Sequence, residues 1–516
     1  MNHWIILPVV LPALVAPFII MVLRYHLDLQ RIFSIAATVA LAAITAGLMA
    51  RVAGGDIIVY ELGDWPAPFG IVLVLDRLSA LMTVLTSFLA LAVLLYAIWS
   101  GWDQRGWHFH ALFQFQLMGV MGAFLTGDAF NLFVFFEVLL IASYGLMIHG
   151  GGGKRLRAGT QYVVYNLVGS TLFLFALGTL YAVTGTLNMA DLSVKVAQLP
   201  ADQTAVLRVG AVLLLLVFAV KAALLPLHFW LPASYANAPA PVAALFAIMT
   251  KVGVYAILRM YTLVFGPDAA VSFGLAGEWL LFAALLTLAV GMVGVLGSAE
   301  IARMTAFAAI GSTGTLMVAV SLFTPQAAGA AVYYMIHSTF ATAMLFLVAD
   351  LVSERRGGDI AVSAPMPHNG VVATLYFGAG IAMAGMPPLS GFIGKLLVLD
   401  AARNDLQVVL IWATVLITSL VAIIGFARAG SLLFWKSSDP SFAAVPVGAE
   451  AGDLAAELPD QPAPPRLPFV PVFALFAMLV LLTVFAGPVT DYADAVAAQL
   501  FDPSGYIGAV LKGEGS

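Results

Sequence analysis

Two stretches of the sequence decide the fold: VFAVKAALLPLHFWLPASYANAPAP at residues 217–241 and GAGIAMAGMPPLSGFIGKLLVLD at residues 378–400. Each lies in an apolar segment of at least about 20 residues, the length that matches a roughly 30 Å hydrocarbon core. Each is also interrupted by proline near its middle, where the ring and the missing N–H break an α-helix. The pattern predicts membrane-spanning helices that are broken inside the bilayer.

The composition of the whole chain is that of a membrane protein. Hydrophobic residues make up 62% of the 516 residues and charged residues only 9%, whereas about 25% of a soluble globular chain is charged. The formal net charge of -5 comes from few groups, so no surface for nucleic acid is expected. The absence of cysteine excludes disulfides, thiolate zinc sites and iron–sulfur clusters. We expect no cofactor and no metal site.

Charged, Gly and Pro clusters delimit about 14 apolar spans, which predicts an all-α, polytopic membrane protein. The broken spans are the seventh and the twelfth. A unit of five helices reverses its orientation when it repeats, so spans 4–8 and 9–13 are predicted to form two inverted five-helix repeats. The predicted segments are an N-terminal three-helix segment at 1–100, the first repeat at 108–264, the second repeat at 276–434, a cytoplasmic linker at 435–467, and a last transmembrane helix with an outer tail at 468–516.

The basic residues predict the orientation, because cytoplasmic loops retain Lys and Arg. They fall mainly in alternate loops, so these loops are expected inside and both termini outside. The linker 435–467 is rich in Pro, Ala and acidic residues and is expected to have little regular structure. The basic residues of the inner loops are Arg24, Arg31, Arg105, Lys154, Arg155, Arg157, Arg303, Arg355, Arg356, Lys436 and Arg466.

Four charged residues fall near the middle of predicted spans: Glu137, Lys221, Lys251 and Lys395. A charge at the bilayer centre costs about 2.5 to 3.5 kcal/mol on insertion scales, so such residues are functional candidates. The proton affinity of a buried lysine depends on the distance to a carboxylate, so Glu137 and Lys221 would form a coupling pair while Lys251 loads and releases a proton. His337 can carry a proton near neutral pH and would pass it toward Lys395.

Structural explanations stay open for these residues. The carboxylate–lysine pair could only stabilise the fold, the other two lysines could bind carbonyls at helix breaks, and the histidine could be a satisfied core residue. His228 lies near the inner end of its span. It is a candidate for a secondary proton path, and a helix-end or water-contact role is at least as good an explanation.

The same residues lie in motifs that resemble a known family. The motifs are FNLFVFFEVLLIASYGLM, KAALLPLHFWLPASYANAPAPVAALFAIMTKVGVY, AEIARMTAFAAIGSTG and GMPPLSGFIGK. They are similar to the antiporter-like subunits of respiratory complex I, membrane-bound hydrogenases and Mrp cation/proton antiporters over roughly residues 70–435. Within that group, the combination of VFFEVLLIASYGLM, KRLRAGTQYVVYNLVGSTLFL and YYMIHSTF followed by LFLVADL is most similar to the D subunit of Mrp antiporters. The resemblance assigns the family's site residues to Glu137, Lys221, Lys251, His337 and Lys395.

The resemblance implies a secondary transporter rather than an enzyme: a proton-translocating subunit of a hetero-oligomeric sodium/proton antiporter in a prokaryotic cell (inner) membrane. Its partners would be other membrane subunits, protons, and sodium, potassium or lithium. One alternative is a proton-pumping subunit of a complex I-like or hydrogenase-type redox complex. Another is a structural scaffold whose buried charges only hold neighbours in register. Some complex I relatives carry a lysine shortly after the histidine, whereas HSTFATAMLF has none.

Overall fold

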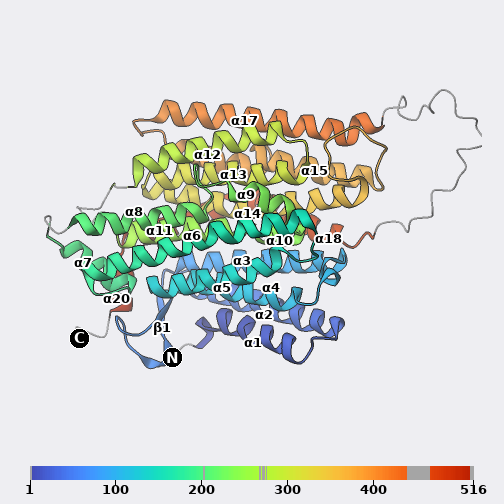
Figure 1. The fold of residues 1–516 in the computed structure, drawn as a ribbon. Coiled ribbons are helices and arrows are strands. Elements are labelled where there is room, and N and C mark those ends of the chain that lie inside the picture. The colour runs from blue at the N-terminus through green and yellow to red at the C-terminus, as the bar shows by residue number, and fades with distance from the viewer. Residues whose placement is uncertain are drawn as a thin grey trace, which may run out of the picture.

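The computed structural model describes residues 3–200, 204–266, 269, 274, 276–438 and 465–511. Most of these residues are helical, so the predicted all-α class is confirmed (Figure 1). In chain order the α-helices are α1 (Leu7–Met21), α2 (Leu27–Val52), α3 (Arg77–Trp99), α4 (Phe109–Leu125), α5 (Ala129–Met147), α6 (Gly153–Thr184), α7 (Met189–Gln198), α8 (Thr204–Lys221), α9 (Trp230–Asn237), α10 (Ala240–Leu245), α11 (Ala247–Leu263), α12 (Gly277–Gly297), α13 (Ile301–Ser321), α14 (Pro325–Arg356), α15 (Asn369–Ala384), α16 (Ser390–Ala401), α17 (Val408–Gly430), α18 (Phe469–Val484), α19 (Ala486–Phe501) and α20 (Ser504–Val510).

Ten helical segments of the described chain are long and apolar enough to cross a membrane, and the bent pair α18 and α19 makes eleven. Three other predicted spans correspond to shorter apolar helices, α1, α4 and α15, of 15, 17 and 16 residues. A helix rises about 1.5 Å per residue, so these three fall short of a roughly 30 Å hydrocarbon core by themselves. The predicted number of fourteen spans is therefore not confirmed.

The first predicted helix break is present. Helix α8 ends at Lys221, and α9 begins at Trp230 after an irregular turn. Neighbouring side chains bind backbone groups that the break leaves without helix partners. The hydroxyl of Thr287 accepts a hydrogen bond of 2.8 Å from the N–H of Leu225. The indole of Trp230 donates one of 3.0 Å to the carbonyl of Val220. The break is thus stabilised by protein contacts.

The second predicted break is also present. Helix α15 ends at Ala384, and α16 begins at Ser390. Gly385 caps α15 with a φ of +77°, a left-handed conformation that glycine adopts readily. Pro387 and Pro388 follow, and neither has an N–H with which to continue the helix. The inverted relation between the two halves stays a prediction.

A short antiparallel β-hairpin precedes α3, and the sequence did not predict it. Its strands are β1 (Ile58–Glu61) and β2 (Val72–Leu75). Figure 1 shows β1, α7 and α20 at the same end of the helix array. The imidazole Nδ1 of His3 lies 3.2 Å from the hydroxyl of Tyr60 on β1, so the first described residues and α20 lie at the same end of the array (Figure 1). A chain that crosses the membrane an even number of times likewise has both of its ends on the same side.

Helix α14 lies at the centre of the array and joins its two halves. In the most apolar part of α14, 94% of the residues are buried, whereas the value is 28% in the segment Val408–Trp435 that contains α17. Figure 1 shows α17 and α1 at opposite edges of the molecule. Helix α14 packs against α10 and α11 of the predicted first repeat and against α13, α15 and α16 of the predicted second repeat. Side chains on α14 can therefore contact both halves.

The last predicted span is α18, and α19 bends away from it by 81° and packs against α14. Of the predicted linker 435–467, residues 439–464 lie outside the described residues. The predicted boundaries of the two repeats, 108–264 and 276–434, stay predictions.

Candidate functional site

Lys221 is the last residue of α8, at the first helix break, and is 6% exposed. Its ammonium donates a hydrogen bond of 3.0 Å to the side-chain oxygen Oδ1 of Asn166 on α6. Glu137 on α5 acts electrostatically on Lys221, but no ion pair joins the two side chains in the described part of the chain. Oxygen Oε1 of Glu137 is buried and has no hydrogen-bond partner there. The carboxylate and the ammonium are thus coupled but separated.

Lys251 lies on α11, within the fully buried segment of the bundle, and is 1% exposed. Helix α11 packs tightly on the end of α8: a Cβ at Gly253 would lie 2.8 Å from the carbonyl oxygen of Phe218 and 3.0 Å from Cβ of Lys221. Among the described residues, Lys251 has no hydrogen bond or ion pair. A buried ammonium without a partner is costly, and binding to carbonyls does not account for this lysine in the described structure.

His337 lies in the middle of α14 and is fully buried. Its ring nitrogen Nδ1 lies 2.9 Å from the hydroxyl of Ser390, the first residue of α16 after the second break. The other nitrogen, Nε2, is buried without a hydrogen-bond partner in the described chain. The hydroxyls of Ser312 and Ser338 form a hydrogen bond of 2.8 Å, and Ser312 lies 3.4 Å from the hydroxyl of Tyr334, one helical turn from the histidine. Within the described chain His337 therefore has one hydrogen-bonded ring nitrogen and one without a partner.

Lys395 lies on α16, just after the second break, and is 5% exposed. Its ammonium donates hydrogen bonds of 2.8 Å to the carbonyl of Ala384, the last residue of α15, and to the hydroxyl of Ser419 on α17. A Cβ at Gly385 would lie 2.6 Å from Cδ of Lys395, so a larger residue at this position would displace the lysine side chain. The carbonyl-bound arrangement that the sequence left open is present here.

The predicted site residues form two electrostatically connected sets. Lys395 and Lys251 both act on His337, although they lie on opposite sides of the sequence midpoint. Glu137 and Lys221 form the second set. The close packing of α11 on the end of α8 brings the two sets together.

His228 lies in the turn between α8 and α9 and is 6% exposed. Its ring nitrogen Nδ1 is buried and unpaired within the described residues. It makes no hydrogen bond there to any of the other predicted site residues. Its assignment to a secondary path stays a prediction.

Three neutral residues that bind the predicted lysines and histidine were missed: Asn166, Ser390 and Ser419. Ser390 could have been found, because it closely follows the two prolines of the second break. Asn166 is a single amide in the apolar run of α6, and only its contact with α8 identifies its role.

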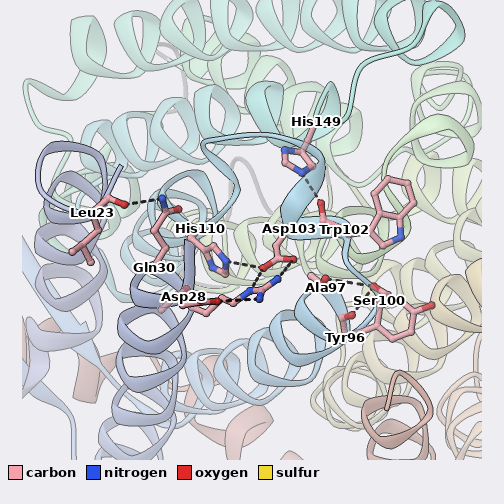
Figure 2. A network of polar contacts seen from close by, with 12 residues as sticks. Leu23, Asp28, Gln30, Tyr96, Ala97, Ser100, Trp102, Asp103, His110 and His149 are labelled. Carbon is pink, nitrogen blue, oxygen red and sulfur yellow. Dashed lines mark hydrogen bonds and ion pairs between the residues drawn. The ribbon is translucent and has the colours of Figure 1, made fainter. Parts of the chain in front are cut away.

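A second polar network lies at one end of the helices, around the short 3₁₀ segment Trp102–Arg105 (Figure 2). The guanidinium of Arg31 donates two hydrogen bonds, of 2.7 and 3.1 Å, to the buried carboxylate of Asp103. His110 donates a third from Nε2 at 3.2 Å. His149 donates to the carbonyl of Trp102 at 2.8 Å. We call these five residues the Trp102 junction; it joins α2, α4 and the end of α5.

The junction also reaches α14. The indole N–H of Trp102 and the hydroxyl of Tyr96 donate to the same oxygen of Asp350, at 2.9 and 2.8 Å. Arg105 forms an ion pair of 2.9 Å with Glu354. A cavity of about 600 Å³ opens beside these residues, with Asp350 and Glu354 on one side and the start of α6 on the other. The cavity is large enough to admit water to the seam between the two halves.

Two groups in the loops of this junction have shifted pKa values. Burial opposes the charged form of Asp103, but the hydrogen bonds from His110 and Arg31 outweigh it and hold the pKa of Asp103 below its ordinary value. Burial lowers the pKa of His149, and the hydrogen bond to the carbonyl of Trp102 offsets only part of that effect. Asp103 is therefore ionised and His149 neutral near pH 7.

At the opposite end of the helices, Asp76 binds Arg259 of α11 through two contacts of 2.6 and 2.9 Å. Asp76 also caps α3, since its carboxylate accepts the backbone N–H of Ser79 at 2.9 Å. The ring of Tyr506 on α20 lies 5.2 Å from the guanidinium. Lys251, Tyr255 and Arg259 are spaced four residues apart on one face of α11. The buried ion pair between Arg259 and Asp76 therefore lies on the same face as the lysine, two helical turns further along the helix.

The chain matches the family model described as NADH:quinone oxidoreductase/Mrp antiporter, TM, over residues 126–422. It is 41% identical to the D subunit of a probable K(+)/H(+) antiporter of Rhizobium meliloti, over 85% of this chain and 88% of the relative. It is 38% identical to the D subunit of the Na(+)/H(+) antiporter of Alkalihalophilus pseudofirmus, over 99% and 100%. A chain in the structure of the Mrp complex from Dietzia sp. superposes with a TM-score of 0.86 at 28% identity, covering 99% of this chain and 100% of that chain.

Among the residues described, no group of three or more His, Asp or Glu side chains could hold a metal ion.

Proposed function

Because the chain belongs to the NADH:quinone oxidoreductase/Mrp antiporter family, we propose a function for its buried charges. The protein is the D subunit of an Mrp-type Na+/H+ or K+/H+ antiporter, a secondary transporter rather than an enzyme, and it works in a complex with other membrane subunits. The antiporter names of these relatives favour cation/proton exchange over the redox-driven alternative.

Within this protein, Glu137, Lys221, Lys251, His337 and Lys395 form a proton relay. Separation of Glu137 from Lys221 is coupled to protonation of Lys251, and His337 passes the proton toward Lys395. The observation that carries the proposal is the burial of three lysines and a histidine around the two helix breaks. Lys221 and Lys395 lie at the breaks, and Lys251 and His337 lie on helices that pack against them, with Nε2 of the histidine unpaired in the described chain. Such groups are costly inside a membrane protein, so their presence favours a functional role.

The chain lies in the cell membrane, and we assign the face with the Trp102 junction to the inner side. Arg31, Arg105 and Arg155 gather at this face, since each contacts Trp102 or a residue of the adjoining 3₁₀ segment, and basic residues favour the cytoplasmic side. The face with β1 and α20 is then the outer one, which agrees with outer termini. Accessibility of single cysteines introduced on either face, in a chain that has none, tests this assignment.

The relay is tested by cation/proton exchange in vesicles that contain the complete complex. We expect Glu137→Gln, Lys221→Ala and Lys251→Ala to abolish exchange of both Na+ and K+ while the complex still assembles on a native gel. Lys195→Ala is the control, because this lysine lies on α7 in a partly exposed ion pair with Asp191. Near-normal exchange by the three variants would reject the relay. Loss of assembly in proportion to loss of exchange would favour the scaffold alternative.

A further inference from the structure

The partner of Lys221 is a neutral amide on a helix to which the sequence assigned no site residue. Nζ of Lys221 donates to Oδ1 of Asn166 at 3.0 Å, and both side chains are buried, with 6% and 2% exposed. The amide is held in place from its other end, because Nδ2 donates at 2.8 Å to the backbone carbonyl of Tyr162, one turn earlier on α6. With Nδ2 bound to a carbonyl, Oδ1 has to face the ammonium.

The carboxylate of Glu137, by contrast, keeps a buried oxygen without a partner in the described chain. The ammonium of Lys221 lies 5.7 Å from the centre of the Phe136 ring. The side chain of Lys221 is therefore bound to α6, and the carboxylate on α5 acts on it only from a distance. The structure captures the separated form of the pair.

We infer that Asn166 is a positioning residue that holds the ammonium of Lys221 away from Glu137 and so sets the pH range in which the pair separates. The inference rests on the proposed relay and deepens it. An amide neither gains nor loses a proton in the physiological range, so Asn166 can bind the charged lysine without competing for its proton. A carboxylate in the same place would hold the ammonium too strongly, and an apolar side chain would not hold it at all.

Few other groups could supply the same function. The titratable groups on the elements packed around Lys221 are Glu137 on α5, Tyr162 on α6 and Lys251 on α11, with His228 in the turn that follows. Of these, only the carboxylate acts appreciably on the lysine. Tyr162 is occupied elsewhere, since its hydroxyl lies 2.9 Å from that of Ser143.

The test measures the pH at half-maximal cation/proton exchange for the complete complex in vesicles. Asn166→Asp adds a charge that stabilises the ammonium, so half-maximal exchange is expected about one pH unit higher. Asn166→Leu removes the acceptor, so we expect it about one unit lower, with a maximal rate reduced about tenfold. Thr171→Val is the control: this residue lies on the exposed side of α6 and bonds only to the carbonyl of Leu167, and no shift is expected.

Shifts in opposite directions support the inference, whereas a purely structural role predicts equal losses at every pH. If either variant fails to assemble, the decision passes to Asn166→Gln and Asn166→Met, which are similar in length and differ in the amide. The Gln variant should keep the wild-type profile and the Met variant should shift to lower pH. Identical pH profiles of the Gln and Met variants overturn the inference.

If Glu137→Gln and Lys221→Ala abolish exchange while the variants at 166 leave the pH profile unchanged, the inference about Asn166 fails and the proposed function stands. If those two relay variants keep exchange, the proposed function fails first.

Discussion

Gly391→Ala perturbs the contact between α14 and the second helix break with a single methyl group. A Cβ at position 391 would lie 1.9 Å from the carbonyl oxygen of Ala382 and 2.9 Å from Nε2 of His337, whereas real Cβ atoms do not approach closer than 3.0 Å. The start of α16 therefore has to move by about 1 Å, since close-packed interiors leave no room for the methyl group. That shift breaks the 2.9 Å contact between His337 and Ser390.

The expected loss of cation/proton exchange in Gly391→Ala follows from the lost hydrogen bond of the His337 imidazole. With Nδ1 also unpaired, both nitrogens of the buried ring lack partners among the described residues, at a cost of about 1 to 3 kcal/mol. A misplacement of about 1 Å at a reacting group can lower a rate roughly 100-fold. We expect Gly391→Ala to reduce cation/proton exchange about 10- to 100-fold, measured as the cation-dependent collapse of a pH gradient in everted vesicles.

Two further variants make this result specific. Gly178→Ala is the matched control, because a Cβ there would have no atom within 4 Å. Ser390→Ala removes the hydroxyl without adding a methyl group, so we expect a smaller loss, about three- to tenfold, from one hydrogen bond. An assembled Gly391→Ala complex with wild-type exchange would refute the reasoning.

Other expected outcomes concern stability. Arg31→Met leaves the buried carboxylate of Asp103 without its guanidinium partner, and we expect a loss of about 3 to 5 kcal/mol, measured by thermal unfolding of the purified complex. The pKa values of Asp103 and His149 are both lowered, so the unfolded chain binds more protons than the folded one. The Trp102 junction should therefore lose stability below about pH 6.5 through His149 and further below about pH 4 through Asp103, seen as faster amide exchange in its 3₁₀ segment. Arg259→Met should cost about 3 to 5 kcal/mol and Asp76→Asn with Arg259→Met less than that; equal losses in the single and double variants would contradict a buried ion pair.

Both helix breaks could be predicted from the sequence because the signal is local. A proline in an apolar segment cannot continue the hydrogen-bond ladder, whatever surrounds it. The charged candidates were found for a similar reason, because the free-energy cost of placing a lysine such as Lys221 or Lys251 in an apolar span is by itself enough to single it out. Neither argument needs knowledge of which helices are neighbours.

The partners of these charges could not be predicted, because they depend on helix packing. Asn166 and Ser419 are neutral polar residues of a kind that occurs in many spans, and most such residues bond to their own helix, as Thr171 does. The sequence indicated only that Arg31 is a basic residue of an inner loop. Its partner Asp103 lies 72 residues later in the sequence, so the contact could not be predicted. The number of spans was uncertain for the opposite reason: hydropathy marks apolar runs, but α1, α4 and α15 are shorter than those runs.

The Trp102 junction also bears on how the protein is made. The indole of Trp102 binds a carboxylate that lies 248 residues later in the chain. At about 5 to 20 residues per second, the ribosome needs on the order of 10 to 50 s to supply that partner. Until α14 is inserted, the indole of Trp102 and the guanidinium of Arg105 lack Asp350 and Glu354, the partners that they bind in the folded chain. Biogenesis therefore passes through a half-protein in which Trp102 and Arg105 still lack the acidic residues of α14 that bind them in the finished fold.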